Sequence, residues 1–76
     1  MQEVDARGLL CPLPLLAAKK ALKALAAGEC VRIIASDPST QQDFIDFCSQ
    51  TGDKLVTNTL KDGNYHFIIQ KAHPHD

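Results

Sequence analysis

The sequence Gly-Leu-Leu-Cys-Pro-Leu-Pro occupies residues 8–14 and places two prolines within three positions. Prolines at this spacing would break the interior of a helix, but the first helical turn tolerates them because its N–H groups have no acceptor within the helix. The pattern therefore predicts that a helix begins at Pro12. Cys11 then takes the N-cap position, with its sulfur beside the positive end of the helix dipole.

The position expected for Cys11 predicts a mildly acidic thiol. Pro12 and Pro14 lack N–H groups, so the backbone donors within reach of a thiolate are those of Leu13 and Leu15. A helix N-terminus favours an exposed anion by about 0.3–1 kcal/mol, which would lower the pKa of the thiol from about 8.5 to about 8. Such modest activation suits a thiol that exchanges sulfur with protein partners. From residue types alone, the alternative is a cysteine that only fills space.

The first half of the chain predicts a strand, a helix and a second strand. Residues 4–6 alternate apolar and polar side chains, as a short half-buried strand does. The helix runs from Pro12 to Ala27, and Gly28 closes it with a left-handed cap. Residues 31–35 are rich in β-branched side chains and indicate a well-buried strand. The helix is amphipathic, with an apolar stripe of Leu15, Ala18, Leu22 and Leu25 opposite Lys19, Lys20 and Lys23.

A second helix follows at Ser-Asp-Pro, residues 36–38. Asp37 is the expected N-cap and Pro38 the expected first helical residue, since a carboxylate can accept the free N–H groups of the first turn. Gly52 ends the helix. The expected apolar face consists of Phe44, Cys48 and Thr51.

The last elements are two strands, residues 55–60 and 65–71, joined through Asp62-Gly63, which is a strong hairpin signal. The order is therefore β-α-β-α-β-β. Crossover connections produce parallel strands, whereas the hairpin adds an antiparallel pair. We expect an α+β fold in which two helices pack against one mixed sheet as a two-layer sandwich, and a single domain over residues 1–76.

Composition narrows the classes of function. A net charge of −1 argues against a broad nucleic-acid surface. The three cysteines, Cys11, Cys30 and Cys48, form no C-x-x-C pair, so we expect neither a zinc knuckle nor a redox dithiol. Cys30 and Cys48 are interpreted as packing residues, although a resolving role for Cys30 stays open.

The chain also lacks the signs of export. Too few cysteines are present for a disulfide framework, which favours a reducing, cytoplasmic compartment. Two prolines interrupt the apolar run of residues 8–18, so we expect no signal peptide and no membrane span. His73 and His75 near the end suggest metal binding only weakly, because no third ligand accompanies them, and we predict no metal site.

The motif Cys11-Pro12-Leu13-Pro14 resembles the Cys-Pro-x-Pro motif of the TusA-like, or SirA-like, family of bacterial sulfur carriers. Residues 5–9 resemble the lead-in to that motif in the family, and residues 37–38 resemble the start of its second helix. The likeness spans residues 4–71. It implies a two-layer α/β sandwich with two helices on one face of a four-stranded mixed sheet.

The resemblance implies that Cys11 is the working residue, with Gly8, Pro12, Leu13 and Pro14 as the supporting motif. The family cysteine accepts sulfane sulfur, as a persulfide, from a cysteine desulfurase or other sulfurtransferase. It passes this sulfur to a downstream relay protein without a cofactor. The best-known destination is 2-thiouridine in tRNA; the alternatives are sulfur oxidation and molybdenum-cofactor supply. Several relatives carry a basic residue directly before the cysteine, where this chain has Leu10, so Arg7 is the remaining candidate cation.

Partner docking is a further hypothesis. Leu13 and Leu16 fall on the lysine side of the first helix and, with Lys20 and Lys23 at the rim, would form a patch for a partner with acidic groups. Arg7 is a further candidate for this surface. The alternative is that both leucines pack beneath the preceding loop. We expect a monomer.

Two other classes of function are alternatives to the carrier. The family fold resembles the C-terminal domain of bacterial translation initiation factor three, which suggests a non-catalytic RNA- or protein-binding regulatory module. The chain lacks paired aromatic residues for stacking bases and lacks positive net charge, so we expect no direct nucleic-acid binding. A redox-regulatory thiol switch would need a nearby resolving cysteine, and the sequence has no other cysteine close to Cys11.

Overall fold

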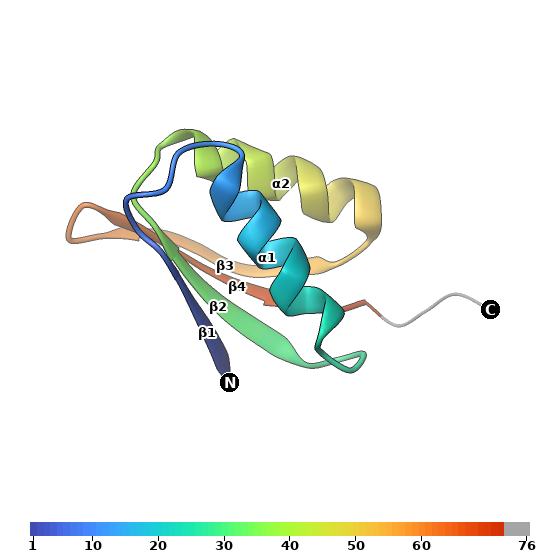
Figure 1. Ribbon diagram of the computed structural model, residues 1–76. Helices are drawn as coiled ribbons and strands as arrows, with labels where there is room; N and C mark the ends of the chain where they lie inside the picture. The colour runs from blue at the N-terminus through green and yellow to red at the C-terminus, as the bar shows by residue number, and fades with distance from the viewer. Residues whose placement is uncertain (73–76) are drawn as a thin grey trace.

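The computed structural model describes residues 1–72 and has two layers, a four-stranded sheet and two helices that cover one of its faces (Figure 1). The predicted α+β sandwich and its element order are confirmed. The elements are β1 (Gln2–Ala6), α1 (Leu13–Lys23), β2 (Cys30–Ala35), α2 (Ser39–Thr51), β3 (Lys54–Lys61) and β4 (Asn64–Gln70).

The sheet has the strand order β1-β2-β4-β3. Strands β1 and β2 are parallel, and β4 runs antiparallel to both of its neighbours. Ala6 pairs with Ala35, so β1 and β2 end at the same edge of the sheet. The loops that lead into α1 and α2 therefore leave the sheet side by side (Figure 1).

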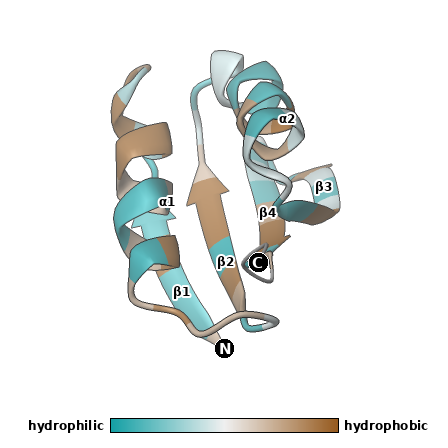
Figure 2. Cartoon of the chain, turned by 90° about the vertical axis from the view of Figure 1, so that its right-hand side faces the viewer, coloured by the Kyte–Doolittle hydropathy of each residue, from teal (hydrophilic) through white to brown (hydrophobic). Residues whose placement is uncertain are grey.

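Strand β2 is buried on one face only. Val31, Ile33 and Ala35 are fully buried, whereas Arg32 is exposed and Ile34 is half-buried. The predicted well-buried strand is correct for this face, and the other face is more exposed because both helices lie on the same side of the sheet. Figure 2 shows this arrangement, with α1 over β1 and β2 and with α2 on the side of β4 and β3.

Two aromatic rings join α2 to the sheet. Phe44 and Phe67 are fully buried, and their ring centroids lie 4.5 Å apart with an interplanar angle of 56°. Such tilted pairs stabilise a core beyond the area that they bury. Cys48 is also buried, but Thr51 is exposed and donates its hydroxyl to Asp53 at 2.9 Å. The predicted apolar face of α2 is thus correct for Phe44 and Cys48 and wrong for Thr51.

The helix ends differ in how well the sequence predicts them. Gly52 adopts a left-handed φ of 83° and donates its N–H to the Cys48 carbonyl, as predicted for the end of α2. In contrast, α1 ends at Lys23 and not at Ala27. The Lys71 Nζ donates to the Leu25 carbonyl at 2.7 Å and satisfies an acceptor of the terminal turn from the far end of the chain.

The predicted hairpin turn is confirmed. Asp62 and Gly63 have φ values of 52° and 78°. Positive φ at both central residues is the requirement of the tight two-residue turn whose twist matches antiparallel strands.

Among the helices of residues 1–72, none is long and apolar enough to cross a lipid bilayer. His73 and His75, the residues of the weak metal suggestion, lie outside the described residues.

Candidate functional site

Two hydrogen bonds tie the loop before α1 to the loop before α2. The Gly8 N–H donates to the Ser36 Oγ at 2.8 Å. The Cys11 N–H donates to the Asp37 Oδ2, also at 2.8 Å. Gly8 has a φ of 81°, which strains any residue with a side chain. The backbone on both sides of the Leu9-Leu10 segment is therefore fixed to the β2–α2 loop.

Asp37 serves both helix starts with one carboxylate. Its Oδ1 accepts the Ser39 N–H at 3.0 Å, while Oδ2 accepts the Cys11 N–H. Both bonds lower the pKa of the Asp37 carboxyl, with the bond from Cys11 as the larger cause. The predicted N-cap position of Asp37 is wrong by one residue, because α2 begins at Ser39 and Pro38 takes the N-cap position, but the Asp37 carboxylate still accepts the Ser39 N–H of the first turn.

Cys11 lies one residue further from α1 than predicted. The helix begins at Leu13, and Pro12 takes the N-cap position. The Leu13 N–H, expected to face the sulfur, instead donates to the Leu10 carbonyl at 2.8 Å. The predicted N-cap placement of Cys11 is therefore wrong, because the helix begins one residue later. The Leu13 N–H is already bonded within the turn that precedes the helix.

The sulfur of Cys11 points to the second helix. Its Sγ donates to the Asp43 Oδ2 at 3.0 Å, and the side chain is exposed. The hydrogen bond to Asp43 raises the pKa of the thiol, as do its partial desolvation and the negative charges of Asp43 and Asp37, while the Ser39 hydroxyl acts in the opposite direction. The predicted lowering of this pKa is therefore wrong.

Sequence reasoning missed Asp43. It lies 32 residues beyond Cys11, within a helix whose outer face carries several polar side chains. No local signal marks it. Only the packing of α2 beside α1 brings this carboxylate to the thiol.

Arg7, the candidate cation, is engaged elsewhere. Its Nε and one terminal nitrogen each donate to the Asp5 carboxylate at 2.9 Å. This pairing lowers the pKa of Asp5 to about 2 and raises that of Arg7. The cation that the sequence suggested as a partner for the thiol therefore faces Asp5.

The other two cysteines have different environments. Cys48 is 6% exposed, and burial raises the pKa of its thiol to about 11. Cys30 is half-buried at the start of β2. All three cysteines are free, and Cys11 alone is exposed.

The Cys11 motif and the fold around it match a known protein family. The family model described as "Sulfurtransferase TusA" matches residues 2–71, which include the Cys11 motif and all six elements. The chain belongs to the TusA family. It is 46% identical over 71 residues to a sulfur carrier protein TusA of Allochromatium vinosum, with 93% of each chain covered. It is 39% identical to a putative sulfur carrier protein of Neisseria meningitidis, covering 91% of this chain and 93% of the relative.

A solved structure supports the same assignment. The crystal structure of a SirA-like protein from Desulfitobacterium hafniense superposes with a TM-score of 0.85 at 29% sequence identity. The match covers 96% of this chain and all of that one. The sandwich that places Cys11 beside Asp43 is therefore the fold of the TusA and SirA-like proteins.

Exposed leucines surround the TusA-family motif in this chain. Leu13 and Leu16 are 48% and 51% exposed, as the docking hypothesis requires, and the alternative that they pack beneath the loop is wrong. Leu10 is 71% exposed and extends the apolar surface to the other side of Cys11. Pro14, in contrast, is fully buried and anchors the first turn of α1.

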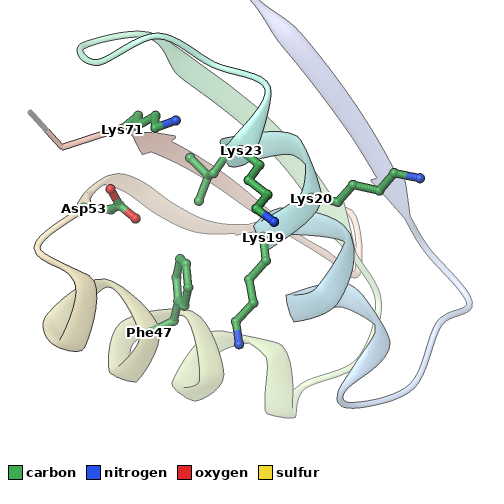
Figure 3. A pocket seen from close by; sticks show the side chains of 7 residues that line it. Lys19, Lys20, Lys23, Phe47, Asp53 and Lys71 are labelled. Carbon is green, nitrogen blue, oxygen red and sulfur yellow. The ribbon is translucent and has the colours of Figure 1, made fainter. Parts of the chain in front are cut away.

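A cleft lies beside the lysine face of α1 (Figure 3). Its volume is about 570 Å³, and the Lys19 Nζ lies 5.7 Å from the centroid of the Phe47 ring. A smaller hollow shares Lys19 and Phe47 with this cleft and reaches Asp43. The cleft is lined by Lys19, Lys20, Leu22, Lys23, Phe47, Asp53 and Lys71.

The Asp37 carboxylate yields the first prediction. Asp37→Ala removes the acceptor of the Cys11 and Ser39 N–H groups, so the Cys11 amide should exchange with solvent severalfold faster, as measured by NMR, and the urea midpoint of unfolding should fall. Because the folded-state pKa of Asp37 is lowered, acidification of the native chain through that pKa should also weaken the clamp. Asp46→Ala, which removes a carboxylate that accepts from Gln42, is the control. Unchanged exchange at Cys11 would contradict the assigned role.

Proposed function

We propose that this chain is a sulfur carrier that holds sulfane sulfur as a persulfide on Cys11 and relays it between proteins. The observation that carries the proposal is the placement of Cys11, the exposed cysteine of the three, on a backbone fixed at Gly8 and at Cys11 itself. The relatives described as sulfur carrier proteins support it.

The proposed loading step is a thiol–persulfide exchange. The Cys11 thiolate attacks the outer sulfur of a persulfide on the donor, so that a new S–S bond forms on Cys11 and the donor cysteine leaves as a thiolate. The proton of the Cys11 thiol passes to solvent, and the leaving thiolate takes one up. No net oxidation or reduction occurs, so the carrier needs no redox cofactor. Delivery repeats the exchange with the acceptor's thiolate as the attacking group.

The Cys11 thiol of the free chain suits a carrier that reacts with its protein partners and only slowly with other electrophiles. Because the Asp43 carboxylate raises the pKa of Cys11, less thiolate is present at neutral pH than in a free cysteine. The thiolate is the nucleophilic form, so adventitious oxidation and alkylation are slowed.

For the route of sulfur, we propose a cysteine desulfurase or other sulfurtransferase as donor and a downstream relay protein as acceptor, with 2-thiouridine in tRNA as the destination. A reducing cytoplasm fits this route, because three free thiols persist there. We propose that the chain acts as a monomer and contacts its protein partners, not the tRNA itself.

Loading with sulfur is the direct test of the carrier. Incubation with a cysteine desulfurase and cysteine should add one sulfur atom to the intact mass of the native chain, and reductant should remove it. Cys11→Ser should abolish the addition, whereas Cys30→Ser, the matched control at a half-buried thiol, should load like the native chain. Equal loading of the Cys11→Ser variant would show that the wrong cysteine has been assigned.

We also propose that Leu16, Lys20 and Lys23, with Arg7 near the edge of the β1–α1 loop, form part of the docking surface for a partner. Leu16 is half-exposed on α1, the helix that Cys11 precedes. Lysines rim the leucines and would attract acidic groups. The apolar centre and charged rim match the anatomy of protein interfaces.

A charge placed at the centre of this surface tests the docking proposal. Leu16→Glu should slow sulfur transfer from the donor severalfold, because it puts a carboxylate in the apolar contact, and the circular dichroism spectrum should stay native because the side chain is exposed. Val56→Glu, at a position of similar exposure on β3, is the control and should transfer at the native rate. Native transfer kinetics in the Leu16→Glu variant would remove Leu16 from the interface.

A further inference from the structure

The surroundings of Cys11 are negatively charged. Asp43 contacts the sulfur, and Asp37 holds the backbone N–H of the same residue. The Asp37 carboxylate accepts two backbone N–H groups, while Asp43 is half-buried beside the exposed Cys11 thiol. An electrophile that approaches this sulfur therefore meets two carboxylates.

The cations of the chain do not neutralise these carboxylates. Within residues 1–72, the ion pairs closer than 4.0 Å are Arg7 with Asp5 and Arg32 with Glu3. Lys19 of α1 and Asp46 of α2 line the same hollow as Asp43, but Lys19 lies over the Phe47 ring. Within residues 1–72, Asp43 thus forms no ion pair closer than 4.0 Å.

The lysines of α1 lie further along that helix. Lys19 and Lys23 project from α1 at the cleft that contains Phe47, while Lys71 enters it from the end of the sheet (Figure 3). The surface therefore has carboxylates at the end nearest the sulfur and mostly ammonium groups at the cleft, where Asp53 is the carboxylate among the lining residues. A partner that covers both ends needs the reverse order of charges.

We propose that Asp43 determines specificity by selecting sulfur donors and acceptors that carry a basic side chain beside their reactive cysteine. The proposal deepens the carrier function proposed above and names the chemistry of the partner's site. Asp43 acts on the reaction through the group that it pairs with, so it is a positioning residue.

The chemistry of exchange explains the selection. A donor persulfide approaches partly as an anion, and so does the thiolate that leaves it, and Asp43 repels both. A basic side chain on the donor pairs with Asp43 and removes this repulsion. The same ion pair weakens the repulsion between the Asp43 carboxylate and a thiolate at Cys11. The thiol therefore ionises more readily in the complex than in the free chain.

Small disulfides of different charge test this selection without any protein partner. Cystamine carries ammonium groups, and 3,3′-dithiodipropionate carries carboxylates, while both exchange with a thiolate through the same step. In each exchange, Cys11 forms a mixed disulfide, one half of the reagent leaves as a thiolate, and no net redox change occurs. The Cys30→Ser background leaves Cys11 as the accessible thiol, because Cys48 is buried.

The readout is the ratio of the two rate constants, which cancels any change in the fraction of thiolate. The chain with Asp43 should favour cystamine, and Asp43→Asn should reduce the ratio about 3- to 10-fold, as expected for one unit charge a few ångströms from the reacting atoms. In the chain that retains Asp43, salt at 1 M should also lower the ratio of the cystamine rate constant to the dithiodipropionate rate constant, because the screening length falls to about 3 Å. Asp46→Asn, the same change of charge three residues away, should leave most of the preference.

Two results would overturn the selection by Asp43. One is an unchanged ratio in Asp43→Asn, and the other is an equal loss of preference in Asp46→Asn, which would assign the effect to net charge. The test does not depend on the carrier function, since it uses no persulfide. A failure of the carrier proposal appears separately, as absent sulfur loading in the mass measurement.

Discussion

The hydrogen bond from the Cys11 N–H to the Asp37 carboxylate is the interaction on which the site depends. It joins the loop before α1 to the loop before α2, and the bond from Gly8 to Ser36 holds the same two loops a few residues away. This clamp of two bonds fixes the Cys11 segment relative to the start of α2. With it, the Cys11 sulfur reaches Asp43.

The sheet makes this clamp possible. Parallel pairing of β1 with β2, in the register that sets Ala6 against Ala35, brings both loops to one edge. Buried Pro14 then fixes the start of α1, and the Phe44–Phe67 pair fixes α2 on the sheet. The core thus sets the distance between two helix starts, and the polar loops between them define the environment of the thiol.

Features encoded by short segments could be predicted from the sequence. The Asp62-Gly63 turn needs only its own positive φ angles, and Gly52 ends α2 for the same local reason. Features that depend on distant residues could not. Lys71 bonds the Leu25 carbonyl just after α1 from 46 positions away, and Asp43 reverses the expected shift in the pKa of Cys11 from 32 positions away. The position of the thiol was therefore close to the prediction, while its ionisation was opposite to it.

The central claim is that the fold presents Cys11 as an accessible thiol whose pKa is raised by a neighbouring carboxylate. The most direct measurement is a pH titration of Cys11, selectively labelled with ¹³C at Cβ, followed by NMR in the native chain and in Asp43→Asn. We predict a pKa above the ordinary value for a cysteine thiol in the native chain and a lower pKa in the variant. A native pKa at or below the ordinary value, unchanged in Asp43→Asn, would contradict the account.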